Sequence, residues 1–166
     1  MVQINESVAF QRRVEPEISL AFRRVFSMLL PEEETFLLRS SAQHIYTDGE
    51  VIIRQDQPYS GIFVIVGGRV CVELEHADGR PPVKVAELSR GDIFGEMSFI
   101  DDEPTSASVS ACDEAEILVI DEDVIQSLLI GDPSFGRRFY HSIAATLAAR
   151  LRDTNPRITG RPFHHS

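Results

Sequence analysis

The sequence lacks any long apolar segment, and this absence removes a whole class of functions. A membrane-spanning helix needs about 20 consecutive apolar residues, and no run in the 166 residues approaches that length. The N-terminal stretch also lacks the apolar core of a secretory signal, since it carries Glu6, Arg12 and Arg13. We therefore expect a cytoplasmic protein that does not insert into membranes.

Cysteine is scarce, and the residues that usually carry catalysis or metal binding form no pattern. Cys71 and Cys112 stand in apolar, strand-like runs, so we expect reduced thiols in a core rather than a disulfide. The five histidines lack the spacing of metal ligands. No nucleophile motif and no Gly-rich phosphate loop occurs. The sequence thus predicts no enzyme, no metal site and no cofactor.

Basic residues are in deficit. Lys and Arg number 16 against 26 Asp and Glu, which gives a formal net charge of −10. A negatively charged protein repels the phosphates of nucleic acid, so nucleic acid is not the expected main partner. Hydrophobic residues make up 43% of the chain, which is enough for one core. We expect a single domain over residues 1–166.

Apolar spacing predicts helices toward both ends of the chain. Apolar residues recur every three or four positions within 17–42, with a first helix over 17–30, and the same spacing returns over 122–155. Pro156 is expected to stop the last helix, because a proline inside a helix removes one hydrogen bond and clashes with the preceding turn. Residues 156–166 would then form a tail.

The central segment, residues 43–121, has the pattern of short strands joined by turns. Apolar and β-branched runs such as 62–66 and 69–74 alternate with turns rich in glycine and aspartate. No alternation of strand and helix occurs, so a parallel sheet is not expected. The pattern indicates a barrel or sandwich, and the fold class is α+β, mainly β.

One stretch of this segment is far more specific than the rest. Residues 91–109 read as a strand, a glycine turn, one helical turn, an acidic loop and a second strand. Gly95 permits backbone angles or a close approach that a side chain would block. Glu96 begins the short helix, whose free N–H groups can hold an anion.

The whole stretch resembles the phosphate-binding cassette of the cyclic nucleotide-binding domain family, whose pattern is roughly F-G-E-[LM]-[AS]-[LF], a short loop, then P-R-[ST]-A-[ST]-V. Within 94–109 every position of the pattern matches except one, where the family's arginine is Thr105. Residues 48–52 and 59–70 are similar to the family's opening strand and hairpin. The resemblance implies an eight-stranded double-stranded β-helix, a jelly-roll-like β-roll of the catabolite activator protein type, flanked by N-terminal and C-terminal helices.

The resemblance also implies a ligand site. The family's glutamate, here Glu96, binds the ribose 2′-hydroxyl. Amides at Gly95, Met97 and Ser98 would face the sugar-phosphate, and Ser106 would contact the phosphate. The ligand-binding residues expected on this basis are Phe94, Gly95, Glu96, Met97, Ser98, Thr105, Ser106 and Ala107.

Some of these residues also have ordinary structural explanations. Thr154 and Asn155 align with positions that contact the base in the activator-type relatives, but they equally suit a helix end. Glu96 could simply cap the short helix. Thr105 and Ser106 could be strand-edge residues without a ligand.

Thr105 lowers the affinity that we expect for a nucleotide. Leaving a buried charge without its partner costs roughly 3–5 kcal/mol, or about a hundred- to several-thousand-fold in affinity. A helix N-terminus recovers only ~0.3–2 kcal/mol. Asp101, Asp102 and Glu103 would repel an anion unless they point to solvent.

Two functions follow from the sequence. The first is a stand-alone, non-enzymatic sensor that binds cyclic AMP, cyclic GMP or a related small anion weakly. The second is a module that has lost the ligand and works by dimerising or by docking on a protein partner.

The long C-terminal helix bears on assembly. We expect a weak homodimer through residues 139–151, because Ile143, Leu147 and Leu151 would be left in water in a monomer. In the competing arrangement the helix folds back over the ligand pocket as a lid, without a dimer. The chain ends soon after this helix, which leaves no room for a helix-turn-helix, so direct DNA binding is not expected.

Overall fold

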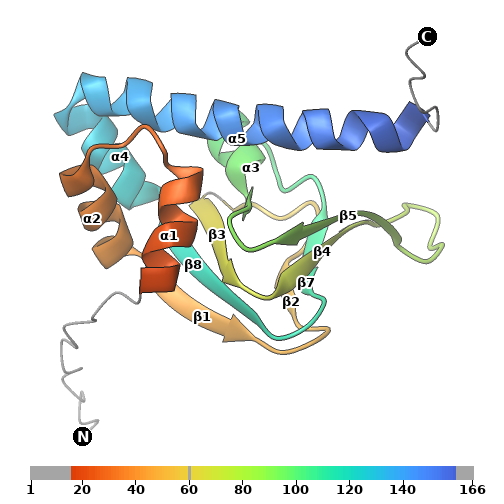
Figure 1. Cartoon of the computed structure of the whole chain (residues 1–166). Helices are drawn as coiled ribbons and strands as arrows, with labels where there is room; N and C mark the ends of the chain where they lie inside the picture. Colours follow the sequence, from red (N-terminus) through yellow and green to blue (C-terminus); the bar gives the residue numbers. More distant parts are fainter. Residues whose placement is uncertain (1–15, 60, 160–166) are drawn as a thin grey trace, which may run out of the picture.

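The computed structural model describes residues 16–59 and 61–159, and it has the expected succession of helices, strands and helices (Figure 1). The strands are β1 (Ala42–Tyr46), β2 (Val51–Ile53), β3 (Gly61–Gly67), β4 (Arg69–Leu74), β5 (Val83–Ser89), β6 (Ile93–Phe94), β7 (Ser108–Ala111) and β8 (Ala115–Asp121). The helices are α1 (Pro16–Val25), α2 (Pro31–Ser40), α3 (Glu96–Asp101), α4 (Glu122–Gly131) and α5 (Pro133–Thr159).

The strands form two four-stranded antiparallel sheets that wrap into a β-roll. Their orders are β1-β8-β3-β6 and β2-β7-β4-β5. Strand β3 is a continuous apolar run because both of its faces are buried. Phe63 and Ile65 belong to the core inside the roll, whereas Ile62, Val64 and Val66 belong to the core under the helices. The predicted eight-stranded β-roll is confirmed.

The helices cover one side of the roll. Helix α5 runs across it, with α3 beneath α5 and with α1, α2 and α4 gathered at one end (Figure 1). Phe139 of α5 stacks on Phe26 and Phe135, with ring centroids 5.6 and 5.3 Å apart. These buried rings fix the start of α5 against the N-terminal helices. Among the described residues, no helix is long and apolar enough to cross a membrane.

Two helix ends differ from the prediction. Helix α1 ends at Val25 rather than at residue 30, because the chain turns there and the Met28 amide donates to the Ser142 hydroxyl at 3.1 Å. At the other end, α5 continues past Pro156 to Thr159, so the expected stop is wrong. The carbonyl that the proline leaves unpaired belongs to Arg152, which lies in an exposed turn where water can satisfy it.

Helix α5 also buries a different face from the one expected. Ile143 is only 1% exposed, and Leu147 packs against the core, so the prediction that both would stand in water is wrong. The apolar residues that α5 exposes include Tyr140, Ala144 and Leu151, with Leu151 66% exposed. Their spacing of four and seven residues places them on one face of the helix.

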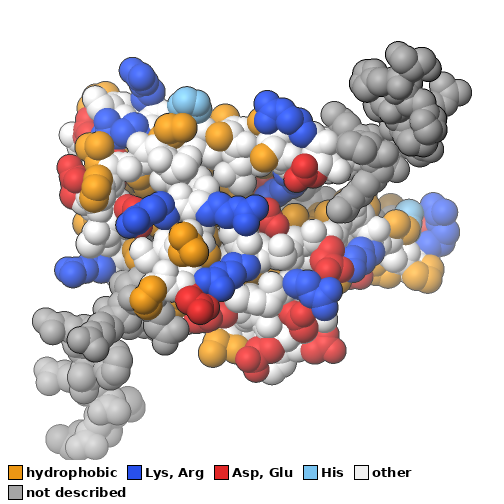
Figure 2. Space-filling view, viewed as in Figure 1, with side chains coloured by type: hydrophobic (Ala, Val, Ile, Leu, Met, Phe, Trp, Pro, Cys, Tyr) orange, Lys and Arg blue, Asp and Glu red, His pale blue; other side chains and the backbone are white. Residues whose placement is uncertain are grey.

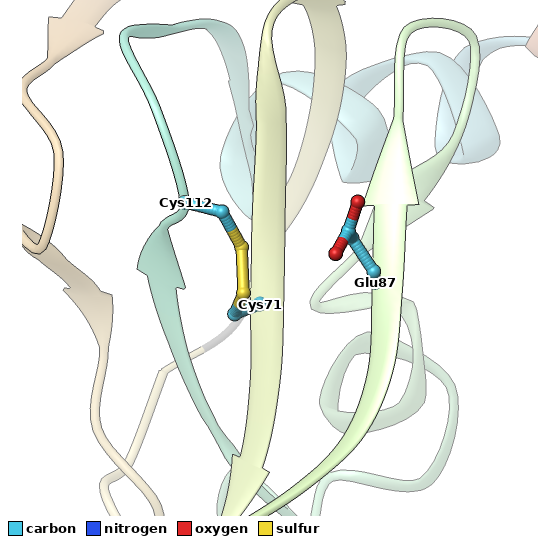
Figure 3. Close-up of side chains that lie close together, drawn as sticks. All are labelled: Cys71, Glu87 and Cys112. Atoms are coloured by element: carbon cyan, nitrogen blue, oxygen red, sulfur yellow. A yellow bond between two sulfur atoms is a disulfide. The ribbon is translucent and has the colours of Figure 1, made fainter.

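The two cysteines are joined, which contradicts the expectation of reduced core thiols. Cys71 of β4 and Cys112, which follows β7, form a disulfide with Cα atoms 5.6 Å apart (Figure 3). Both are half-buried rather than buried. Strands β4 and β7 are neighbours, with Cys71 opposite Ser110, so the pairing is a consequence of tertiary strand order that spacing along the chain does not reveal.

We predict that this disulfide contributes about 2–4 kcal/mol to stability, because it closes a chain segment of 41 residues and restricts the unfolded state. Urea unfolding with and without a dithiol reductant measures the difference. The matched control is the Cys71→Ala, Cys112→Ala double variant, whose unfolding should not respond to the reductant. Equal midpoints for the wild type in both conditions would contradict the prediction.

Candidate functional site

All eight predicted ligand-binding residues line one cavity, which we call the cassette pocket. Its volume is about 110 Å³. The lining residues from the cassette are Phe94, Gly95, Glu96, Met97, Ser98, Thr105, Ser106 and Ala107. Ligand sites commonly have volumes of about 300–1,000 Å³, so the pocket is small in this conformation.

Gly95 sets the geometry at the floor of the pocket. Its φ of 80° lies in the left-handed region, directly before the first residue of α3. A Cβ atom on Gly95 would stand 2.9 Å from both the Gly61 carbonyl oxygen and the Phe63 ring. Both observations require glycine, as the sequence predicted. The resulting turn places Glu96 in the pocket lining with only 4% of the residue exposed.

The Glu96 carboxylate is held by a residue from α5. Arg150 Nη1 donates to Glu96 Oε1 at 3.2 Å, and Arg150 Nη2 donates to the Ile93 carbonyl oxygen. Burial raises the pKa of Glu96 above its ordinary value, while the charge of Arg150 and the Glu96 backbone N–H oppose that rise. The carboxylate therefore stands in an environment that favours an additional hydrogen-bond donor.

Thr105 cannot take over the role of the family's arginine. The residue is 4% exposed. Its hydroxyl accepts a hydrogen bond from the Gln57 amide at 3.0 Å and donates to the Arg54 carbonyl oxygen. Its backbone bonds the same loop, through Asp56 and Gln57. Thr105 thus braces residues 54–57, and its uncharged hydroxyl is already engaged.

The acidic loop after α3 does not obstruct the pocket. Asp101, Asp102 and Glu103 are exposed, and none of them lines the cassette pocket. Figure 2 shows Lys and Arg side chains spread over the face that carries α1 and α5, while acidic side chains are most frequent toward the lower end of the roll. An anion in the pocket therefore meets Arg150 rather than this acidic loop.

Arg150 is the functional candidate that sequence reasoning missed. It is the one basic residue among those that line the cassette pocket in the described part of the chain. A signal was present, because Arg150 follows Leu147 by three positions and so shares the face that packs on the roll. Nothing in the local sequence, however, says which part of the roll that face covers.

A second cavity, which we call the helix cleft, lies between β5 and α5. Its volume is about 680 Å³, and its lining includes residues 85–89 of β5 and Thr154 of α5. Leu88 and Arg150 line both cavities, so the two meet there. Thr154, one of the two predicted base contacts, is exposed in the cleft and donates to the Arg150 carbonyl oxygen at 2.8 Å. The side chain of Asn155, the other, lies outside the described residues.

One further cluster has the composition of a metal site. Sulfur atoms of Cys71 and Cys112 and a carboxylate oxygen of Glu87 lie within 4.8 Å of one another (Figure 3). The sulfur atoms are bonded to each other, so neither is a free thiolate. Glu87 is held by Arg69 at 2.8 Å and Lys84 at 2.6 Å, which lower its pKa through hydrogen bonds and charge. We therefore assign no metal site to this cluster.

Comparison with known proteins agrees with the cassette pattern. The family described as "Cyclic nucleotide-binding domain" matches residues 43–132, which is more than half of the chain. The cyclic AMP receptor protein of Thermus thermophilus is 30% identical over 131 residues, covering 79% of this chain and 58% of the relative. Cyclic GMP-binding protein C of Dictyostelium discoideum is 30% identical over 125 residues, covering 75% of this chain but 5% of the relative. The chain thus spans less than two thirds of these relatives.

Solved structures agree on the fold. The catabolite activator protein of Thermus thermophilus superposes with a TM-score of 0.65 at 29% identity, covering 82% of this chain and 62% of that one. A cyclic nucleotide-binding domain from Methylobacillus flagellatus superposes with a TM-score of 0.73 at 21% identity, covering 94% and 96% of the two chains. The second likeness concerns the fold alone.

We predict that Thr105→Val lowers the free energy of unfolding by about 1–3 kcal/mol, because it removes the two hydrogen bonds that the buried Thr105 hydroxyl makes to the Gln57 amide and the Arg54 carbonyl oxygen. Chemical denaturation of the ligand-free protein measures the change. Ser106→Ala is the matched control, since Ser106 is exposed and its hydroxyl meets only Met97 Sδ at 3.7 Å. Equal stability of the two variants would show that Thr105 does not brace the loop.

Proposed function

Because the chain belongs to the cyclic nucleotide-binding domain family, we propose that it binds cyclic AMP or cyclic GMP and acts as a non-enzymatic regulatory module. The observation that carries the proposal is the cassette pocket, in which all eight cassette residues surround one cavity with a buried glutamate in its lining. In the structure, Arg150 of α5 is the ion-pair partner of that glutamate.

Each cassette residue has a defined role in this proposal. The Glu96 carboxylate accepts a hydrogen bond from the ribose 2′-hydroxyl. The amides of Gly95, Met97 and Ser98 face the sugar-phosphate, where the turn before α3 leaves backbone N–H groups free. Ser106, exposed at the pocket mouth, contacts the phosphate.

The proposed signal is a change in the position of α5. Besides its core packing, the helix is held by ion pairs at two points, Arg138 with Glu33 near its start and Arg150 with Glu96 at the pocket. These points are twelve residues apart, or about 18 Å along a helix. A ligand that forms a hydrogen bond with Glu96 weakens only the ion pair of Glu96 with Arg150. The outer part of α5 is then free to move while its start stays anchored. Ligand occupancy thereby shifts the balance between two helix positions.

A cytoplasmic location is part of the same proposal. The Cys71–Cys112 disulfide weighs against it, because thiols in the cytosol are generally kept reduced.

A specific observation also favours assembly through α5. Tyr140, Ala144 and Leu151 form an exposed apolar stripe along the helix. We propose a weak homodimer through residues 139–151 that uses this stripe in place of the buried Ile143. In the second candidate function, the module works through this dimer or through a protein partner without any ligand.

We predict that cyclic AMP or cyclic GMP raises the melting temperature. At a concentration of about 100 times Kd, a ligand adds about 2.7 kcal/mol to the native state, which corresponds to roughly 5–10 °C for a chain of this size. Differential scanning fluorimetry measures the shift. Glu96→Ala should abolish it, and Glu103→Ala, an exposed acid of the adjacent loop, should leave it intact. No shift in the wild type with either nucleotide would favour the ligand-independent function.

We predict that Leu151→Glu converts the dimer to a monomer, since it places a charge in the apolar stripe. Sedimentation velocity over a range of micromolar concentrations measures the association. Leu20→Glu is the matched control, because Leu20 is 68% exposed on α1, away from the stripe. A monomeric wild type, or a dimeric Leu151→Glu variant, would contradict the proposed dimer.

A further inference from the structure

The guanidinium of Arg150 is incompletely satisfied where it stands. One terminal nitrogen donates to Glu96 and the other to the Ile93 carbonyl, but the Nε atom is buried and has no hydrogen-bond partner among the described residues. A buried donor without an acceptor is unusual in a native structure and costs free energy. This N–H group therefore lacks an acceptor in the present arrangement of Arg150.

Arg150 also stands at the junction of the two cavities. It lines both the cassette pocket and the helix cleft, together with Leu88. The cassette pocket alone, at about 110 Å³, is below the usual size of a ligand site, whereas the cleft offers about 680 Å³. A ligand larger than the pocket can extend into the cleft, where it meets Arg150.

We infer that Arg150 supplies the positive charge that pairs with the cyclic phosphodiester, in place of the arginine that is absent at position 105. This inference rests on the proposed function. Thr105 is uncharged and its hydroxyl is engaged by the loop at 54–57. Arg150 is the basic residue that the described part of the chain brings to the pocket, and a guanidinium suits the planar, two-oxygen face of a phosphodiester.

The binding step is an exchange of partners. The ribose 2′-hydroxyl donates to Glu96, and the carboxylate then no longer needs Arg150 as its donor. Arg150 turns its freed N–H groups to the phosphate oxygens, which are stronger acceptors than a neutral carbonyl. After the exchange the phosphate is paired with Arg150, and the Glu96 carboxylate keeps the 2′-hydroxyl as its hydrogen-bond donor, which reduces the main cost of a missing cassette arginine.

This arrangement has a consequence for specificity. The residue that binds the phosphate belongs to α5 rather than to the cassette. Binding of the phosphate by Arg150 and a change in the position of α5 therefore occur together. An uncharged nucleoside can donate a hydrogen bond from its 2′-hydroxyl to Glu96, but it has no phosphate group for Arg150 to bind. The cyclic nucleotide should therefore bind more tightly than the nucleoside, and Arg150 should account for the difference.

The test compares cyclic AMP and cyclic GMP with adenosine and guanosine by titration calorimetry. The proteins are the wild type, Arg150→Met and the control Arg152→Met, which removes an exposed arginine two positions further along α5. We expect Arg150→Met to lose about 10- to 100-fold in affinity for the cyclic nucleotides and to bind the nucleosides at least as tightly as the wild type does. Arg152→Met should match the wild type for every ligand.

Circular dichroism of each variant establishes that it is folded. If Arg150→Met does not fold, Arg150→Gln carries the test, because glutamine removes the charge but can still donate to the Ile93 carbonyl. A charge-neutral variant that keeps the wild-type preference for the cyclic nucleotide overturns the inference and leaves the proposed function standing. A wild type that binds neither cyclic nucleotide overturns the proposed function, and the inference with it.

Discussion

The ion pair between Glu96 and Arg150 is the constraint on which the rest of the site depends. A carboxylate that is 4% exposed pays a desolvation cost, which the raised pKa of Glu96 reflects, and a positive charge nearby reduces that cost. Arg150 comes from α5, more than fifty residues further along the chain. Removing either partner would leave the other buried and unpaired. The Glu96–Arg150 ion pair therefore ties the outer part of α5 to the pocket.

The rest of the fold positions the two partners of this ion pair. The aromatic cluster around Phe139 and the ion pair of Arg138 with Glu33 anchor the start of α5 on the N-terminal helices. The β-roll holds Gly95 and Glu96 on a turn that only glycine permits. A ligand thus acts on a helix whose start is fixed and whose outer part is tied to the pocket through Arg150, which bonds Glu96 and the Ile93 carbonyl oxygen. Such a two-position element is what a regulatory module needs in order to report occupancy.

The parts of the structure that depend on local pattern could be predicted from the sequence. Strand and helix periodicity located the strand-rich centre and its flanking helices, and the cassette pattern located eight of the residues that line the pocket. The disulfide could not be predicted, because it depends on β4 lying beside β7. Arg150 was missed for the same reason, since its role depends on where α5 crosses the roll. Pro156 failed as a stop signal because an exposed helix end tolerates the lost hydrogen bond.

The exchange of partners at Arg150 is the central claim, and a crystal structure of the full chain with cyclic AMP or cyclic GMP tests it most directly. The account predicts that the Glu96 carboxylate contacts the ribose 2′-hydroxyl, that the Arg150 guanidinium contacts the phosphate oxygens, and that the outer part of α5 has moved relative to the roll. A bound nucleotide whose phosphate is held by the cassette alone, with Arg150 still paired to Glu96, would contradict it.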